Sequence, residues 1–257
     1  MDAPLQIIFV GHHRWRAQFV FNGNAYPTNI RSVVDACASR YALLLYHTSV
    51  MRQALQRDIS DFRSMIEGQR TDLEKALRSR PDLTSVAVYD GLPHLAEMHS
   101  SLSISKSFLD LYAKLVGKLI NPLNNWNFGK ANVGGGEVSG GRLVNALRNS
   151  GQQSLAGLAD LTLEHSRRWI TEAVKYRDQL SHRSDLDHMR CMQLPLHCTD
   201  PHINFSELVM PAMPNGQDLG EYLDGLLSNL AEYVSESIIM LPNIDSTLIS
   251  PKRLVTT

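Results

Sequence analysis

The chain has 257 residues, of which 43% are hydrophobic and 20% are charged, and its formal net charge is −1. This composition is that of a folded globular protein with room for one large domain or two small ones, and it excludes a disordered chain. The near-zero net charge also excludes a strongly basic nucleic-acid coat protein, although it leaves open a local basic site.

Cysteine spacing and apolar runs indicate the compartment. Cys37, Cys191 and Cys198 make an odd number, and the last two are not spaced like zinc ligands. No secretory signal is evident, and the longest apolar runs are far too short to cross a membrane. We therefore expect a soluble, cytoplasmic protein with three free thiols and no membrane association.

The N-terminal part combines a short hairpin with a long helical stretch. Residues 6–11 and 15–21 are rich in β-branched and aromatic side chains around a turn-like GHHR, which predicts a β-hairpin. Residues 29–67 contain neither glycine nor proline, and their apolar side chains recur every three or four positions. They predict one very long helix or two in close succession, continuing to about residue 80. Residues 85–89, SVAVY, predict an isolated strand.

A second helical half follows. Residues 96–120 predict a helix, and residues 121–141 predict a long loop rich in asparagine and glycine. Helices resume near residue 142 and again over 154–181, where His165 and Trp169 fall on the apolar face. Residues 191–214 read as extended, and their prolines would confine any strand to a sheet edge. A last amphipathic helix is expected over 219–240.

These elements predict a mainly α protein. We expect a helical bundle of long antiparallel helices with small β-hairpin and edge-strand additions. Residues 1–95, an N-terminal hairpin plus long helices, would pack on a core formed by residues 96–257, and the whole would be one compact unit.

Three features suggest chemistry but favour simpler interpretations. The glycine-rich stretch 134–141 lacks the lysine and hydroxyl residue of a P-loop, and the segment before it is too short for the strand of a dinucleotide fold. A flexible loop is favoured, one that could still close over a substrate. His12 and His13 sit in an expected turn without a third ligand in register. His197 and His202 have irregular, proline-rich surroundings, so we expect no metal site.

The sharpest clue is the segment YRDQLSHRSDL at residues 176–186. Arg177 followed five positions later by His182 is a weak pattern alone, but this pair ends a strongly patterned helix and has Asp178 directly after the arginine. On a continued helix Asp178 and His182 share a face, so the carboxylate could hold the imidazole in one tautomer. Arg177 lies about 140° around the helix from His182. The two converge only if the helix breaks near Leu180 or a second copy faces the first.

Residues 169–186, WITEAVKYRDQLSHRSDL, resemble the signature of HEPN domains (higher eukaryotes and prokaryotes nucleotide-binding). These are helical bundles marked by an arginine, a polar residue, a short spacer and a histidine. The upstream segment 105–120, SKSFLDLYAKLVGKLI, is similar to the helix that packs against the motif helix in that family. The resemblance covers about a third of the chain and does not account for the first hundred residues.

The resemblance implies a homodimer that brings two such motifs into one composite active site. It also implies a metal-independent endoribonuclease that needs no cofactor and acts on RNA. His182 would then act as general base or acid on a ribose 2′-hydroxyl, and Arg177 would hold the scissile phosphate. Asp178 would orient the histidine, and the product would be a 2′,3′-cyclic phosphate. Arg183 is the expected contact to the RNA backbone.

Family habit also suggests a biological setting, that of a toxin or phage-defence effector with an antitoxin or other regulatory protein as a further partner. In the toxin branch a tyrosine that the antitoxin modifies stands two residues after the histidine. This chain has Ser184 there, so that regulation is not expected. Some relatives keep the fold but serve only as binding modules. The alternative function is therefore a non-catalytic helical module that dimerises and binds a nucleotide or protein partner.

Overall fold

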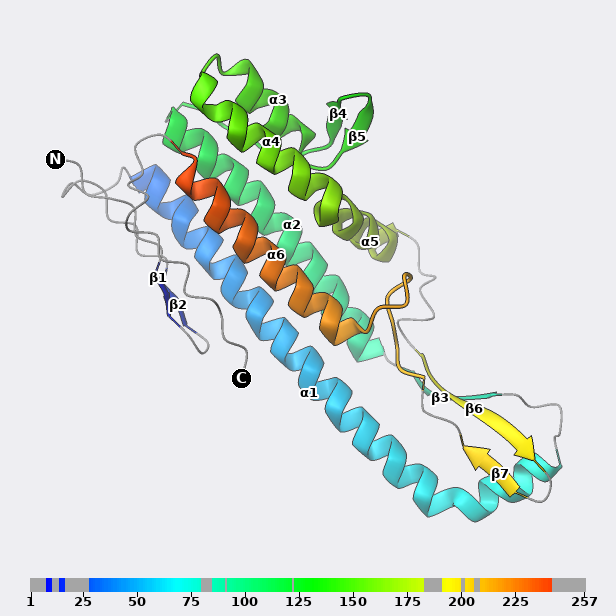
Figure 1. The fold of residues 1–257 in the computed structure, drawn as a ribbon. Helices are drawn as coiled ribbons and strands as arrows, with labels where there is room; N and C mark the ends of the chain where they lie inside the picture. Colours follow the sequence, from blue (N-terminus) through cyan, green and yellow to red (C-terminus); the bar gives the residue numbers. More distant parts are fainter. Residues whose placement is uncertain are drawn as a thin grey trace. The chain divides into compact units, whose positions relative to one another are not determined.

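The computed structural model describes residues 8–10, 14–16, 28–79, 85–90, 92–121, 123–182, 191–199, 202–205 and 209–241. Helices dominate these residues and strands are few (Figure 1), so the expected mainly α class with small β additions is confirmed. The chain divides into two compact units. The first unit comprises Met1–Tyr46, Ser101–Gln179 and Gly225–Thr257, and the second comprises His47–Ser100 and Leu180–Asp224. The expected grouping into 1–95 and 96–257 stays a prediction.

The first helix, α1 (Thr28–Arg78), is a single helix of 51 residues, which decides between the one helix and the two that the periodicity allowed. The absence of proline over its whole length lets the backbone ladder run without a break. The apolar stripe that predicted the helix is buried at Val34, Tyr41, Leu44, Met51 and Leu55.

The second helix, α2 (Leu92–Ile120), begins earlier than its periodicity predicted. Pro93 is its second residue, and the first turn tolerates proline because the N–H groups there have no intrahelical partner to lose. The later helices are α3 (Gly141–Asn149), α4 (Ala156–His165), α5 (Thr171–His182) and α6 (Leu219–Ile239). A 3-10 turn precedes α4, and a π-helical turn, Ser166–Ile170, joins α4 to α5, so the helix predicted over 154–181 is present with one widened turn.

A chain of aromatic rings forms the core of the first unit. Tyr41 of α1 lies edge-on to Phe108 of α2, with 6.2 Å between ring centroids, and Phe108 stacks on Tyr112 at 6.1 Å. Tyr112 then meets Tyr233 of α6 at 5.6 Å, and Phe128 meets Tyr233 at 6.3 Å. Each such pair adds about 0.5–1.5 kcal/mol beyond the area it buries. These contacts place α1, α2 and α6 side by side within this unit (Figure 1).

The second unit packs the middle of α1 against the first turns of α2 and α6. Met51, Met98 and Leu223, one from each helix, are fully buried. His94 on α2 has no exposed surface, and its Nε2 lies 2.9 Å from Oδ2 of Asp58 on α1. Asp58 thereby provides an ion-pair partner for a ring that would otherwise be costly to bury.

The second unit also contains a three-stranded antiparallel sheet, in the order β3 (Ser85–Asp90), β6 (Cys191–Thr199) and β7 (His202–Phe205). Two predictions about it are wrong. Residues 85–89 are not an isolated strand, because they pair with β6. The strand β6 is central although it contains Pro195. The register explains this position, since β3 pairs with residues 191–195 and β7 pairs with residues 196–199. Pro195 therefore lies where one partner ends and the other begins.

Two hairpins complete the β structure. The strands β1 (Ile8–Val10) and β2 (Arg14–Arg16) pair antiparallel, which confirms the predicted N-terminal hairpin in a shorter form. Residues 121–141, predicted to be a loop, contain a second hairpin, β4 (Ala131–Val133) and β5 (Gly136–Val138). Its two-residue turn has φ angles of 62° at Gly134 and 88° at Gly135, a left-handed conformation that favours glycine. The loop prediction was wrong here because strands of three residues carry almost no periodicity.

Candidate functional site

The motif residues Arg177, Asp178 and His182 all lie on α5, whose helical path is unbroken through His182. The break near Leu180 that would have brought the arginine and the histidine together is therefore absent, and about 140° of helix rotation separates them. Arg177 and Asp178 belong to the first unit, whereas His182 is exposed and belongs to the second unit. Arg183, the expected RNA-backbone contact, lies outside the described residues.

A charged cluster surrounds Asp178. Its Oδ1 lies 2.8 Å from Nη2 of Arg177, and its Oδ2 accepts a hydrogen bond from Nζ of Lys130 at 3.1 Å. The side chains of Arg177, Asp178 and Lys130 are 30%, 33% and 47% exposed, so solvent or a ligand reaches all three. Each carboxylate oxygen that was expected to orient His182 thus has a cation as its partner. Sequence reasoning missed Lys130, because no local pattern links it to a residue 48 positions away.

Arg177 keeps unused hydrogen-bonding capacity. A guanidinium has five N–H donors, and within the described residues the ion pair of Arg177 with Asp178 is made through Nη2. Its Nε is buried and has no acceptor within the described residues. An unpaired buried donor is uncommon in a purely structural ion pair, because it costs free energy that a better arrangement would avoid. The remaining donors suit an anion such as a phosphate.

The hairpin β4–β5 places Lys130, which directly precedes β4. The backbone N–H of Arg142 donates to the carbonyl of Gly129 at 3.1 Å, which ties this segment to the start of α3. Gly140 has a φ of 87°, and a Cβ there would lie 2.5 Å from the ring of Phe128. The glycines of the stretch 134–141 therefore serve a tight turn and a close approach between segments. The favoured flexible loop is wrong, because the segment forms a packed hairpin.

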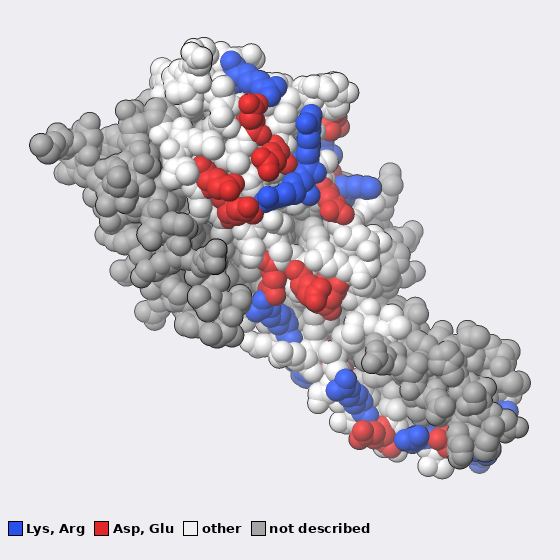
Figure 2. Space-filling model, viewed as in Figure 1, with Lys and Arg blue, Asp and Glu red and all other residues white. Residues whose placement is uncertain are grey.

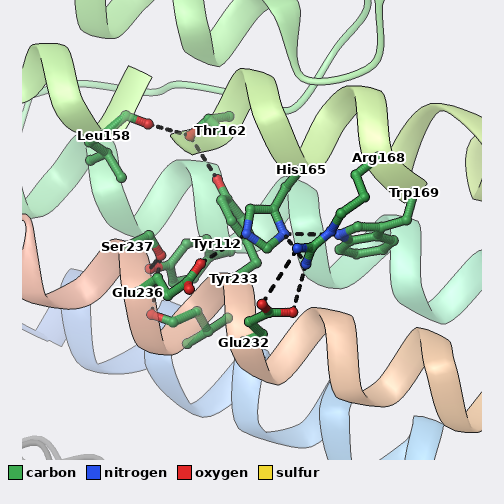
Figure 3. Close-up of polar contacts among 11 residues, drawn as sticks. Tyr112, Leu158, Thr162, His165, Arg168, Trp169, Glu232, Tyr233, Glu236 and Ser237 are labelled. Atoms are coloured by element: carbon green, nitrogen blue, oxygen red, sulfur yellow. Dashed lines mark hydrogen bonds and ion pairs between the residues drawn. The ribbon is translucent and has the colours of Figure 1, made fainter. Parts of the chain in front are cut away.

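A second polar cluster lies in the first unit, where the π-helical turn joins α4 to α5 (Figure 3). His165 is only 1% exposed, and its Nε2 lies 3.0 Å from Oε2 of Glu236. Its Nδ1 accepts hydrogen bonds from Nε1 of Trp169 at 3.0 Å and from Nη2 of Arg168 at 3.4 Å. Arg168 in turn binds Glu232 at 2.6 Å.

These contacts define the protonation of His165. Indole and guanidinium N–H groups are donors only, so Nδ1 must present a lone pair and the ring proton lies on Nε2, where Glu236 accepts it. Both ring nitrogens of this neutral tautomer are engaged, and the ring has almost no exposed surface. π-helical turns often mark functional sites. Here, however, the widened turn serves a saturated network that leaves no nitrogen for a substrate.

Charge is mixed on the face shown in Figure 2, where acidic and basic side chains alternate over the first unit. Within this unit Arg148 and Asp160 form an ion pair at 2.9 Å. An open pocket of about 450 Å³ on this unit is lined by Asp160, Leu163, Glu164, Arg167 and Arg168. Its lining carries both signs, and Arg168 is already paired. Among the residues coloured in that view we therefore find no continuous basic surface of the kind that follows a nucleic-acid backbone.

Histidines and cysteines could also hold a metal ion or act as nucleophiles. Among the described residues, no group of three or more His, Cys, Asp or Glu side chains could hold a metal ion. His197 and His202 lie in β6 and β7, and His12 and His13 lie outside the described residues. Cys37 is a free thiol, and burial raises its pKa to about 12, which makes it a poor nucleophile at neutral pH.

No helix in the described part of the chain combines the length and the apolar character needed to cross a bilayer. Comparison of the chain with protein-family models, with curated proteins and with solved structures finds no match to any of them. Function is therefore inferred from the residues and their contacts alone.

Proposed function

We propose that this protein is a metal-independent endoribonuclease of the HEPN type, in which Arg177 binds the scissile phosphate and His182 transfers a proton. The observation that carries the proposal is the pair of part-exposed cations at Asp178, with Arg177 at 2.8 Å and Lys130 at 3.1 Å. Together they suit a phosphodiester, because the guanidinium offers forked donors and the ammonium a point charge. His182 is exposed at the end of α5, as proton transfer to a bound substrate requires.

The reaction is a transesterification within RNA. His182 removes the proton of a ribose 2′-hydroxyl, and the resulting oxygen attacks the adjacent phosphorus. The bond from phosphorus to the 5′-oxygen breaks, and that oxygen takes up a proton, which leaves a 2′,3′-cyclic phosphate and a 5′-hydroxyl end. Arg177 stabilises the negative charge that develops on the phosphoryl oxygens. Asp178 holds the two cations in place, and its expected contact with His182 stays a prediction.

A homodimer with a composite active site is part of the proposal. Arg177 and His182 lie about 140° apart on one continuous helix, so we expect one copy to supply the arginine and a second copy the histidine. Mixing Arg177→Ala with His182→Ala protein should then restore cleavage, because a mixed dimer contains one intact pair whereas each variant alone contains none. If cleavage stays absent after the subunits have exchanged, both residues act from the same copy.

The decisive test is RNA cleavage in excess EDTA. We expect the wild-type protein to leave 2′,3′-cyclic phosphate ends, and we expect Arg177→Ala and His182→Ala each to lose at least about 100-fold in rate. Lys175→Ala is the matched control, because Lys175 is an exposed cation on the same helix. RNA that stays intact with the wild-type protein, or an equal loss in the Lys175 variant, contradicts the proposal.

A second candidate is a non-catalytic helical module that binds a nucleotide or protein partner. The observation in its favour is the contact between Arg177 and Asp178, because an arginine already paired at 2.8 Å can serve as a structural ion pair. In that case Arg177→Ala lowers the melting temperature and no cleavage is present to lose. The same EDTA assay with parallel melting curves separates the two candidates.

A further inference from the structure

A second histidine is bonded to the last turn of the motif helix. Nε2 of His99, on α2, lies 3.1 Å from Oγ of Ser181, the residue that directly precedes His182. His99, Ser181 and His182 belong to the same compact unit, and all three are exposed. Ser181 and His182 are consecutive, with Cα atoms about 3.8 Å apart, so the hydrogen bond anchors His99 to the residue next to His182.

One ring nitrogen of His99 makes a hydrogen bond, and the other is available to a ligand. Its Nε2 is engaged by the serine hydroxyl, and its Nδ1 has no hydrogen-bond partner within the described residues. The neighbouring histidine on α1 differs, because Nδ1 of His47 lies 2.6 Å from Oε2 of Glu97. His99 therefore combines a set position, an exposed ring and a nitrogen available to a substrate.

Cleavage by 2′-hydroxyl attack needs two proton transfers, one from the nucleophile and one to the leaving 5′-oxygen. A single histidine that has just acted as base does not deliver its proton to the opposite side of the phosphorus in the same step. Arg177 does not release a proton in proteins, and the carboxylate of Asp178 is bound to two cations. The chemistry thus requires a second proton-transfer group, one that faces the leaving 5′-oxygen.

We propose that His99 is the general acid that protonates the leaving 5′-oxygen, while His182 is the base that removes the 2′-hydroxyl proton. This assignment rests on the proposed ribonuclease function and adds a catalytic residue to it. The imidazolium of His99 gives its proton to the 5′-oxygen as the phosphorus–oxygen bond breaks, and it is left neutral. Ser181 positions the ring through its hydroxyl.

The test compares two substrates that differ in leaving group. In a dinucleotide such as UpA the 5′-oxygen must be protonated as it leaves, whereas 4-nitrophenolate departs from uridine 3′-(4-nitrophenyl phosphate) without a proton. We expect His99→Gln to lose about 100-fold or more on the dinucleotide and to keep nearly the full wild-type rate on the nitrophenyl ester. We expect His182→Ala to lose both activities. Glutamine keeps a hydrogen-bonding group opposite Ser181, and a melting curve of each variant checks the fold.

The outcomes separate this inference from the function on which it rests. A His99→Gln variant that loses equally on both substrates, or loses on neither, overturns the role of His99 while the ribonuclease stands. A wild-type protein that cleaves neither substrate overturns both. His47→Gln is the control, because His47 lies on α1 beside the same stretch of α2 and has no part in the proposed chemistry. It should match the wild-type protein on both substrates.

Discussion

Two histidines of the same helical path differ in the properties that decide what a histidine does. His165 lies just before the π-helical turn, is 1% exposed, and has both ring nitrogens bonded to Glu236, Trp169 and Arg168. His182 ends α5, is exposed, and has no bonding partner within the described residues. The fold engages both ring nitrogens of the first histidine, whereas the ring of the second is open to a substrate.

The difference shows how to recognise a functional polar group when no relative is known. Burial with saturated hydrogen bonds makes a group costly to change, and for the same reason it makes the group inert towards a ligand. Exposure with unused donors does the opposite, as Arg177 and Lys130 show around Asp178. A conspicuous cluster such as that of Figure 3 is therefore the weaker candidate for chemistry, although it holds more contacts.

Substitution of His165 tests the difference between the two histidines most directly. We expect His165→Ala to lower the free energy of unfolding by about 2–4 kcal/mol, because it removes the partner of three polar groups and leaves a cavity beside Trp169. Urea denaturation measures the loss, and cleavage per folded molecule should stay unchanged. His182→Ala should show the reverse, with stability kept and cleavage lost. If His165→Ala leaves stability intact, the buried network contributes nothing and the distinction between the two histidines fails.

Two glycines with a left-handed backbone separate the cost of backbone strain from the cost of lost packing. Gly140 has a φ of 87°, and a Cβ there would lie 2.5 Å from Phe128 and 2.9 Å from Oγ of Ser166. Gly151 has a φ of 71°, with nothing within 4 Å of its Cβ position. We expect Gly151→Ala to cost about 1 kcal/mol from backbone strain alone, and Gly140→Ala to cost about 2–4 kcal/mol because a steric clash is added. Urea denaturation of both variants isolates the packing contribution, and equal losses would contradict it.

Much of the fold could be predicted because its signals are local. The proline-free spacing of α1 indicated a helix, and the helical spacing that put His165 and Trp169 on an apolar face was right about their burial, at 1% and 7% exposed. The strands were harder. β4 and β5 have three residues each, too few for an alternation to stand out, and the central place of β6 depends on which partners pair on either side of Pro195.

The residues of the candidate site could be predicted from the sequence, but their contacts could not. Arg177, Asp178 and His182 are close in the chain, so a pattern could find them. Their contacts were not visible, because Lys130 reaches Asp178 across 48 positions and His99 reaches Ser181 across 82. Helical spacing placed Asp178 on the face of His182, yet two cations bind the carboxylate instead. The attraction of a carboxylate to a cation is stronger than its hydrogen bond to an uncharged group, and only the tertiary structure brings Lys130 to Asp178.

A third histidine, His94, is buried like His165 but lies in the second unit. His94 has no exposed surface, and burial lowers its pKa below the ordinary 6.5 in spite of Asp58 and its opposing effect. As the pH falls below about 6.5, the unfolded chain therefore binds a proton before the folded chain does. The free energy of unfolding should fall by at most about 1.4 kcal/mol per pH unit from this group, until the pH drops below the folded pKa. Urea denaturation between pH 5 and about 7.5 measures this slope, and His94→Gln should flatten it. An unchanged slope in the variant would show that His94 is not the group responsible.

The smallest expected effect is that of a substitution at Lys130. It tests whether the charged cluster of Lys130, Arg177 and Asp178 binds RNA. In a His182→Ala background, which should bind RNA without cutting it, Lys130→Gln should weaken binding a few-fold and reduce the slope of log Kd against log salt by about 0.7, the value for one phosphate contact on a single strand. Fluorescence anisotropy with a short RNA measures both quantities, and Lys175→Gln on the same background is the control. If Lys130 only neutralises Asp178, its removal leaves the salt slope unchanged, because no counterion was displaced from the RNA. A changed slope at Lys130 together with an unchanged slope at Lys175 would place a phosphate beside Asp178, where Arg177 has donors to spare.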